Sequence, residues 1–209
     1  MRGKVILYSG YGFTNLYFNS LRNVLESVQD GSPFLTTEGE EIFQFNKQLA
    51  DFKGFITIQP TTRDGENHEA LIITPDNHLP YKPVTREQFL QAKLKFYQSQ
   101  NQGGLFTNDI ASLTSMIGNM SLAERQTAAI VRDISAAPSR AKIFVTEAES
   151  GRHLVTIDKS YFNPKLPRDT IQFMTIHCSW NNQDIPKVQA IQRFKQNFDF
   201  MALKQMLGK

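Results

Sequence analysis

A stretch with three prolines, Pro75–Pro83, constrains the fold of this chain more than any other feature. Proline lacks a backbone N–H and restricts the residue before it, so this stretch is predicted to be an extended loop rather than a central strand. Thr85 and Gln88 follow at the spacing of a helix capping box. Apolar residues then recur at helical intervals, which predicts an amphipathic helix over residues 86–100.

Short strand patterns fill the chain before this loop. They are predicted at Val5–Tyr8, Asn15–Phe18, Glu41–Phe45, Gly54–Gln59 and Glu69–Thr74. The first two are separated by a glycine-rich turn, and the last two by an Asp-Gly turn, so each pair is expected to form a hairpin.

The chain after residue 104 alternates helical and strand patterns. Helices are predicted at Asn108–Ile117, Leu122–Asp133, Lys187–Asn197 and Phe200–Leu207, and strands at Lys142–Glu147, His153–Ile157 and Ile171–Cys178. The order predicts an α+β fold with two strand-rich halves, each followed by helix and joined by a helical segment.

This order divides the chain into an N-terminal strand-rich half (1–104), a helical connector and linker (105–139) and a C-terminal strand-rich half with terminal helices (140–209). A single domain is the alternative, because 209 residues with 40% hydrophobic side chains suit one core or two small ones.

The charge of the chain argues against nucleic acid as a partner. The formal net charge is only +3, divided as −1 over residues 1–104 and +4 over residues 105–209. Binding through phosphates usually needs denser Lys and Arg clusters. An anion-binding or nucleic-acid-binding module is therefore the third functional alternative, after a binding protein and a hydrolase.

No metal or cofactor is expected from the sequence motifs. Cys178 is the single cysteine, which excludes an intramolecular disulfide and a multi-cysteine metal site. The chain also lacks the His-Glu-x-x-His spacing of zinc enzymes and the glycine-rich loops that bind phosphates.

Catalytic residues are not indicated, and we keep a hydrolase only as an alternative. It would use the carboxylates of Glu147 and Asp158, or Cys178 as a nucleophile. Neighbouring residues on a strand point to opposite faces, so His177 is not expected to be the base for Cys178. One of the other histidines, His68, His78 or His153, could approach that thiol in the folded chain.

Two proline-containing loops, 75–85 and 158–169, are where we predict ligand binding. Ordered loops beside rigid strands often carry binding residues. Tyr81, Arg86, Tyr161 and Arg168 are the candidate ligand-binding residues. If both loops lie on one side of the molecule, these residues could line a shared groove for a carbohydrate or an anionic small molecule. The alternative is that the loops brace the sheet.

Three further segments stand out, namely Pro80–Arg86, Leu154–Arg168 and Asn197–Phe200. In these segments the chain resembles a group of exported proteins of the Bacteroidetes type with no established activity, and the resemblance covers roughly residues 35–207. It implies a periplasmic or secreted protein, with a cytoplasmic one as the alternative. The apolar run after Met1 is too short for a signal peptide, and no run is long enough for a membrane span. We therefore expect a soluble chain and, if the protein is exported, a signal peptide that has been removed.

Overall fold

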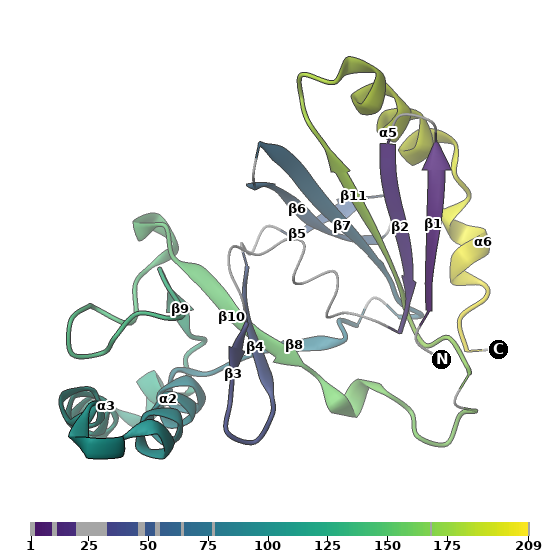
Figure 1. Ribbon diagram of the computed structural model, residues 1–209. Coiled ribbons are helices and arrows are strands. Elements are labelled where there is room, and N and C mark those ends of the chain that lie inside the picture. Colours follow the sequence, from purple (N-terminus) through teal and green to yellow (C-terminus); the bar gives the residue numbers. More distant parts are fainter. Residues whose placement is uncertain are drawn as a thin grey trace. The chain divides into compact units, whose positions relative to one another are not determined.

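The computed structural model describes residues 3–9, 12–19, 33–45, 49–52, 55–63, 65–76, 78–167 and 169–208. It contains helices and two antiparallel sheets, which confirms the predicted α+β class (Figure 1). The chain forms two compact units. Unit 1 comprises residues 1–30, 46–80 and 158–209, and unit 2 comprises residues 31–45 and 81–157. These boundaries differ from the three consecutive segments suggested by the sequence, because each unit collects strands that are distant along the chain.

Unit 1 is built on a six-stranded antiparallel sheet in the order β1-β2-β11-β7-β6-β5. The strands are β1 (Gly3–Ser9), β2 (Gly12–Phe18), β5 (Leu49–Phe52), β6 (Phe55–Arg63), β7 (Glu66–Ile73) and β11 (Met174–Trp180). Both predicted hairpins, β1 with β2 and β6 with β7, are confirmed. The short helix η3 (Lys159–Tyr161) precedes β11, and α5 (Ile185–Asn197) and α6 (Phe200–Lys204) follow it.

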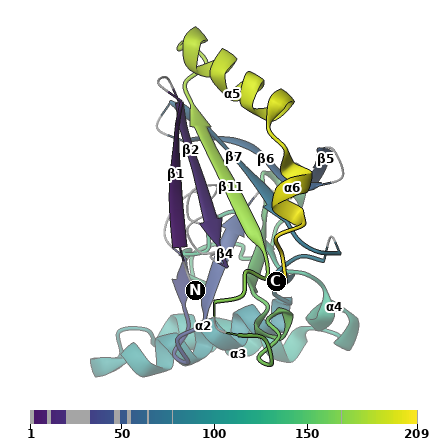
Figure 2. The ribbon, with the colours of Figure 1, turned by 90° about the vertical axis from the view of Figure 1, so that its right-hand side faces the viewer.

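The two C-terminal helices cover one face of this sheet (Figure 2). Along β11, alternate residues Met174, Ile176 and Cys178 point to that face, as the two-residue period of a strand requires. They pack with Ile191 of α5 and Phe200 of α6. The apolar residues that predicted the strand are therefore the residues against which the two helices pack.

Unit 2 combines a smaller sheet with helices. The strands are β3 (Phe34–Leu35), β4 (Glu41–Phe45), β8 (Tyr81–Pro83), β9 (Ile130–Val131) and β10 (Arg152–Ile157), in the order β3-β4-β10-β8 with β9 also paired to β10. The helices are α2 (Arg86–Gln100), η1 (Gln102–Gly104), α3 (Thr107–Asn119), α4 (Leu122–Gln126) and η2 (Glu147–Glu149).

Helix α2 begins where the sequence predicts it. The Thr85 hydroxyl accepts from the Gln88 backbone N–H, and the Gln88 side chain accepts from the Thr85 N–H, which completes the capping box. Phe89 and Leu90 are fully buried and pack with Ile42 and Leu154 of the sheet. The apolar stripe of the helix thus forms the centre of the unit 2 core.

Two predicted elements of unit 2 are wrong. The helix expected over 122–133 ends at Gln126, and β-branched Ile130 and Val131 pair with β10 instead, because tertiary pairing overrides the weak helix preference of such residues. The strand expected over 142–147 is irregular, with one bridge between Phe144 and Val131. Its apolar alternation reflects buried side chains without a continuous ladder.

Candidate functional site

A pocket of about 260 Å³ in unit 1 lies where the two proline-containing loops come together. We call it the loop pocket. Its lining residues are Pro75, Asp76, His78, Ser160, Tyr161, Leu166, Gln172 and Gly208. The first three come from the loop after β7, and the next three from the loop before β11. A backbone hydrogen bond from Asp158 N–H to the Pro80 carbonyl, 3.0 Å long, joins the same two loops.

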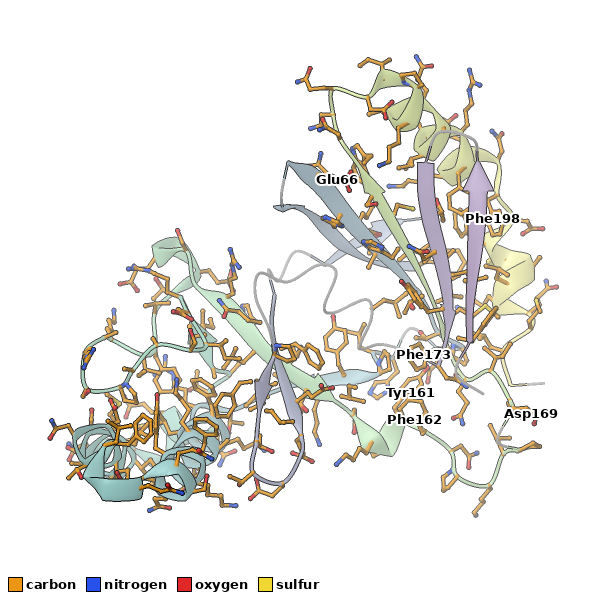
Figure 3. The ribbon with its side chains drawn as sticks, viewed as in Figure 1. Glu66, Tyr161, Phe162, Asp169, Phe173 and Phe198 are labelled. Carbon is orange, nitrogen blue, oxygen red and sulfur yellow. The ribbon has the colours of Figure 1, made fainter. Side chains whose placement is uncertain are left out.

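Tyr161 is held in the pocket wall by surrounding rings. Its ring centroid lies 5.9 Å from that of His78 with the planes nearly parallel, and 5.7 Å from that of Phe173 in an edge contact. Phe162 contacts both Tyr161 and Phe173, and Figure 3 shows these three rings together. Such edge and stacked contacts fix an aromatic side chain in one position.

The charge of the Asp76 carboxylate affects the pKa of the Tyr161 hydroxyl. Burial raises the pKa of Tyr161 to about 12, and the negative charge of Asp76 adds to that increase. The hydroxyl donates to the Gln172 carbonyl at 3.4 Å. The phenol therefore stays protonated at neutral pH and remains a hydrogen-bonding group.

Local hydrogen bonds shape both loops around the pocket. Asp76 Oδ1 accepts from the His78 backbone N–H at 3.1 Å, so the aspartate turns its own loop. Asp158 Oδ1 accepts from the N–H and the hydroxyl of Ser160 and caps η3. The Gln172 side chain accepts from the Asn163 N–H at 2.8 Å, which fixes the middle of the second loop.

The four ligand-binding candidates do not all lie in this pocket. Tyr161 lines it. Tyr81 is buried in β8 and Arg86 begins α2, so both belong to unit 2. The Arg86 guanidinium lies 5.0 Å from the centre of the Phe144 ring, a contact that ties the helix start to its own unit. Arg168 lies outside the described residues.

The carboxylates of the hydrolase alternative have separate local partners. Glu147 Oε1 lies 2.7 Å from His153 Nε2 in unit 2. Asp158 belongs to unit 1, where it is the cap of η3. These contacts are those expected of structural residues at a turn and a helix start.

The surroundings of Cys178 do not favour a nucleophile. Burial raises the pKa of the thiol to about 11, opposed by its hydrogen bond with Thr14, whose Oγ1 is 3.7 Å from Sγ. The adjoining cavity measures about 10 Å³, room for about one water molecule. A reactive cysteine needs a lowered pKa and access, and Cys178 has neither.

Sequence reasoning did not place Asp76, His78 or Gln172 at a ligand site, although they supply much of the polar lining, and it considered His78 only as a partner for Cys178. Asp76 and His78 lie within the predicted loop. Two polar side chains so close together in a proline-rich loop could have indicated a binding site there. Gln172 lies in the segment that was expected to be strand, although β11 begins two residues later.

Comparison with protein-family models, curated proteins and solved structures finds no match for this chain. Among the described helices, none is long and apolar enough to cross a membrane. In the same part of the chain, no group of three or more His, Cys, Asp or Glu side chains is placed to hold a metal ion.

Proposed function

We propose that this protein is a non-catalytic binding protein whose loop pocket takes a small ligand rich in hydroxyl groups, such as a single sugar ring. The observation that carries the proposal is the composition of the pocket wall. Two rings, Tyr161 and His78, stand beside hydrogen-bonding groups of Asp76, Ser160 and Gln172. Binding sites of this kind combine apolar surface with a few placed polar groups.

The charge of the pocket favours a neutral ligand over the anionic one considered above. Of the described residues that line it, Asp76 carries a negative charge and none is a lysine or an arginine. The same carboxylate contributes to the raised pKa of Tyr161, so its charge is felt inside the pocket. A carboxylate accepts hydrogen bonds from sugar hydroxyls but repels a phosphate or a second carboxylate.

The size of the pocket also limits the ligand. At about 260 Å³ it lies just below the roughly 300–1,000 Å³ typical of drug-sized ligand pockets, which suits one ring rather than a long chain. We also expect the protein to work outside the cytoplasm, as its resemblance to exported proteins implies.

A ligand screen with matched variants tests this function. Neutral monosaccharides should raise the melting temperature of the wild type, whereas glucuronate and inorganic phosphate should not. Asp76→Asn should weaken sugar binding at least tenfold, because the amide lacks the charge that strengthens a hydrogen bond from a hydroxyl. The amide oxygen can still accept from the His78 N–H, so this variant is expected to fold.

Asp169→Asn is the matched control, since Asp169 is an exposed carboxylate in the second loop that does not line the pocket (Figure 3). It should bind sugars like the wild type. Equal sugar affinities of the wild type and Asp76→Asn would refute the proposed site. A response to anions alone would refute the proposed ligand class.

A further inference from the structure

Two histidines that are 109 residues apart in the sequence meet on the central strands of the unit 1 sheet. His68 Nδ1 of β7 lies 3.2 Å from His177 Nε2 of β11. The ring planes differ by 8°, and the ring centroids are 5.3 Å apart. The centroid separation exceeds the nitrogen separation by about two ring radii, so the rings meet edge to edge through these two nitrogens.

The strand register explains why the two rings can meet. His177 is directly opposite Ala70, and His68 is directly opposite Ser179, so the histidines are diagonal neighbours on one face of the sheet. Each histidine therefore faces a small side chain across the ladder, which leaves space for the rings to lean toward each other. This face is opposite to that of Cys178, which is paired with Glu69.

We propose that His68 and His177 form a binding site for a divalent transition-metal ion of the Zn²⁺ type. Imidazole nitrogen is a preferred ligand of Zn²⁺, Cu²⁺ and Ni²⁺. With Zn–N bonds of about 2.0–2.1 Å, two ligands of a tetrahedral zinc ion lie about 3.3 Å apart. The separation of 3.2 Å between the two facing nitrogens matches that spacing.

Metal binding involves a rearrangement of the proton that the two rings share. In the neutral pair, one facing nitrogen carries the N–H and the other accepts it. When a metal binds, that proton moves to the outer nitrogen of its own ring, and each ring turns so that its lone pair points at the metal. The two rings hold the same two protons before and after this change, and the ion takes the place of the hydrogen bond.

The positions of the two strands favour a rigid site. β7 lies between β11 and β6, and β11 lies between β2 and β7, so both histidines are held on interior strands. His177 is buried and His68 is half-buried, which leaves an approach from the side of His68. Two imidazoles leave the other coordination positions of the ion to water or to a ligand.

This site is separate from the loop pocket. Glu66, at the start of β7 near His68, and Tyr161 lie at opposite ends of the unit 1 sheet (Figure 3). His68 and Pro75 are seven residues apart along an extended chain, which corresponds to roughly 20 Å. The metal site and the proposed sugar site can therefore be tested independently.

Calorimetric titration of the full chain with ZnCl₂ tests the proposal. The wild type should bind one equivalent, and His68→Gln and His177→Gln should each weaken binding at least tenfold. His78→Gln and His153→Gln are matched controls, since each removes one imidazole elsewhere, and they should change the affinity less than twofold. With one equivalent of CuCl₂, the electron paramagnetic resonance spectrum should show nitrogen hyperfine coupling that is lost in His68→Gln.

His68→Gln is the decisive variant, because its half-buried position makes misfolding less of a concern than at buried His177. Circular dichroism spectra would verify that it folds like the wild type. Absence of zinc binding by the wild type, or equal binding by His68→Gln, would overturn the metal site and would leave the pair as a structural hydrogen bond. Asp76→Asn should bind zinc like the wild type, so a failure of the sugar site would not affect this result.

Discussion

Each unit has a lysine whose ammonium group is held by residues of the same unit, buried in unit 2 and half-buried in unit 1, and the two lysines are held in different ways. Lys93 of unit 2 is 1% exposed, and its ammonium donates to the carbonyls of Ile134 and Ala136 at 2.9 and 2.8 Å. Lys195 of unit 1 instead donates to both carboxylate oxygens of Glu69 at 2.8 Å.

The difference shows how the partners of a lysine ammonium group set its electrostatic environment. Carbonyl dipoles and aromatic faces satisfy the hydrogen bonds of Lys93, whose ammonium lies 5.2 Å from the centre of the Phe89 ring, but they do not supply a full negative charge in contact. Burial consequently lowers the pKa of Lys93 to about 8, although the more distant charges of Asp133 and Asp109 oppose this. At Lys195 the contacting carboxylate supplies that charge, and removal of the lysine takes a neighbouring positive charge away from the buried carboxylate.

The largest loss of stability is expected when the lysine of the Lys195–Glu69 ion pair is replaced. Lys195→Met leaves the Glu69 carboxylate, whose side chain is 10% exposed, without this ion pair. An uncompensated buried charge costs several kcal/mol, so we expect a loss of about 3 kcal/mol in the free energy of unfolding. Urea denaturation at pH 7 measures it.

Glu69→Gln is the matched variant from the other side of the pair. The Lys195 side chain is 30% exposed and can turn its ammonium toward water, so the expected loss is smaller, about 1 kcal/mol. A larger loss for Glu69→Gln than for Lys195→Met would show that the lysine, not the carboxylate, is the more deeply buried charge.

The next largest change in stability is expected from a change of pH, and it is caused by Lys93 of unit 2. The pKa of Lys93 is about 8 in the folded protein against 10.5 ordinarily, so between these values the unfolded chain holds a proton that the folded protein has lost. Stability therefore rises with pH in this window. From pH 7 to pH 9 the gain from this group is about 1 kcal/mol.

Lys93→Met is the control for this titration. It keeps an unbranched apolar side chain but cannot titrate, so its stability should lack that increase. Burial also raises the pKa of Cys178 from 9.0 to about 11, so its titration begins to lower the stability of both proteins as the pH approaches 9. The difference between the two profiles removes this shared effect, and the comparison stops at pH 9. Parallel pH profiles of the wild type and Lys93→Met would mean that Lys93 does not lose its proton in this range.

The sequence predicted those parts of the fold whose signals are local. Helix α2 has its cap, its first turn and its apolar stripe within 16 residues, and its observed bounds agree with the prediction. The hairpin of β6 and β7 is likewise specified by adjacent residues and one turn. The predicted end of α4 was wrong because Ile130 and Val131 pair with strand β10, more than 20 residues away in the sequence.

The candidate sites depend on pairings that the sequence does not reveal. The insertion of β11 between β2 and β7 brings His177 to His68 and Cys178 to Thr14. Tyr161 was proposed as a binding residue because of its loop, but Asp76 and His78 were not. Which loops lie next to each other depends on the topology of the whole sheet, which the sequence does not reveal. Tyr81 was grouped with Tyr161, yet β8 pairs with β10 and holds it in unit 2.

A third lysine gives the smallest expected effect and sharpens the comparison of the other two. The Lys187 side chain is 8% exposed, but the carboxylate beside it, Glu66, is 42% exposed, and the two charged atoms are 3.4 Å apart. Glu66 is the first residue of β7 and lies at one end of the sheet, where solvent can reach it (Figure 3). Water reaches the position of the carboxylate, and the amide oxygen of Glu66→Gln can still accept from the lysine there, so the change should cost less than about 0.5 kcal/mol although the lysine is buried. Urea denaturation at low and at high salt measures this loss, which should vanish at high salt because screening weakens exposed pairs. A loss that matches that of Lys195→Met and persists at high salt would show that the exposure of the carboxylate does not decide the strength of such a pair.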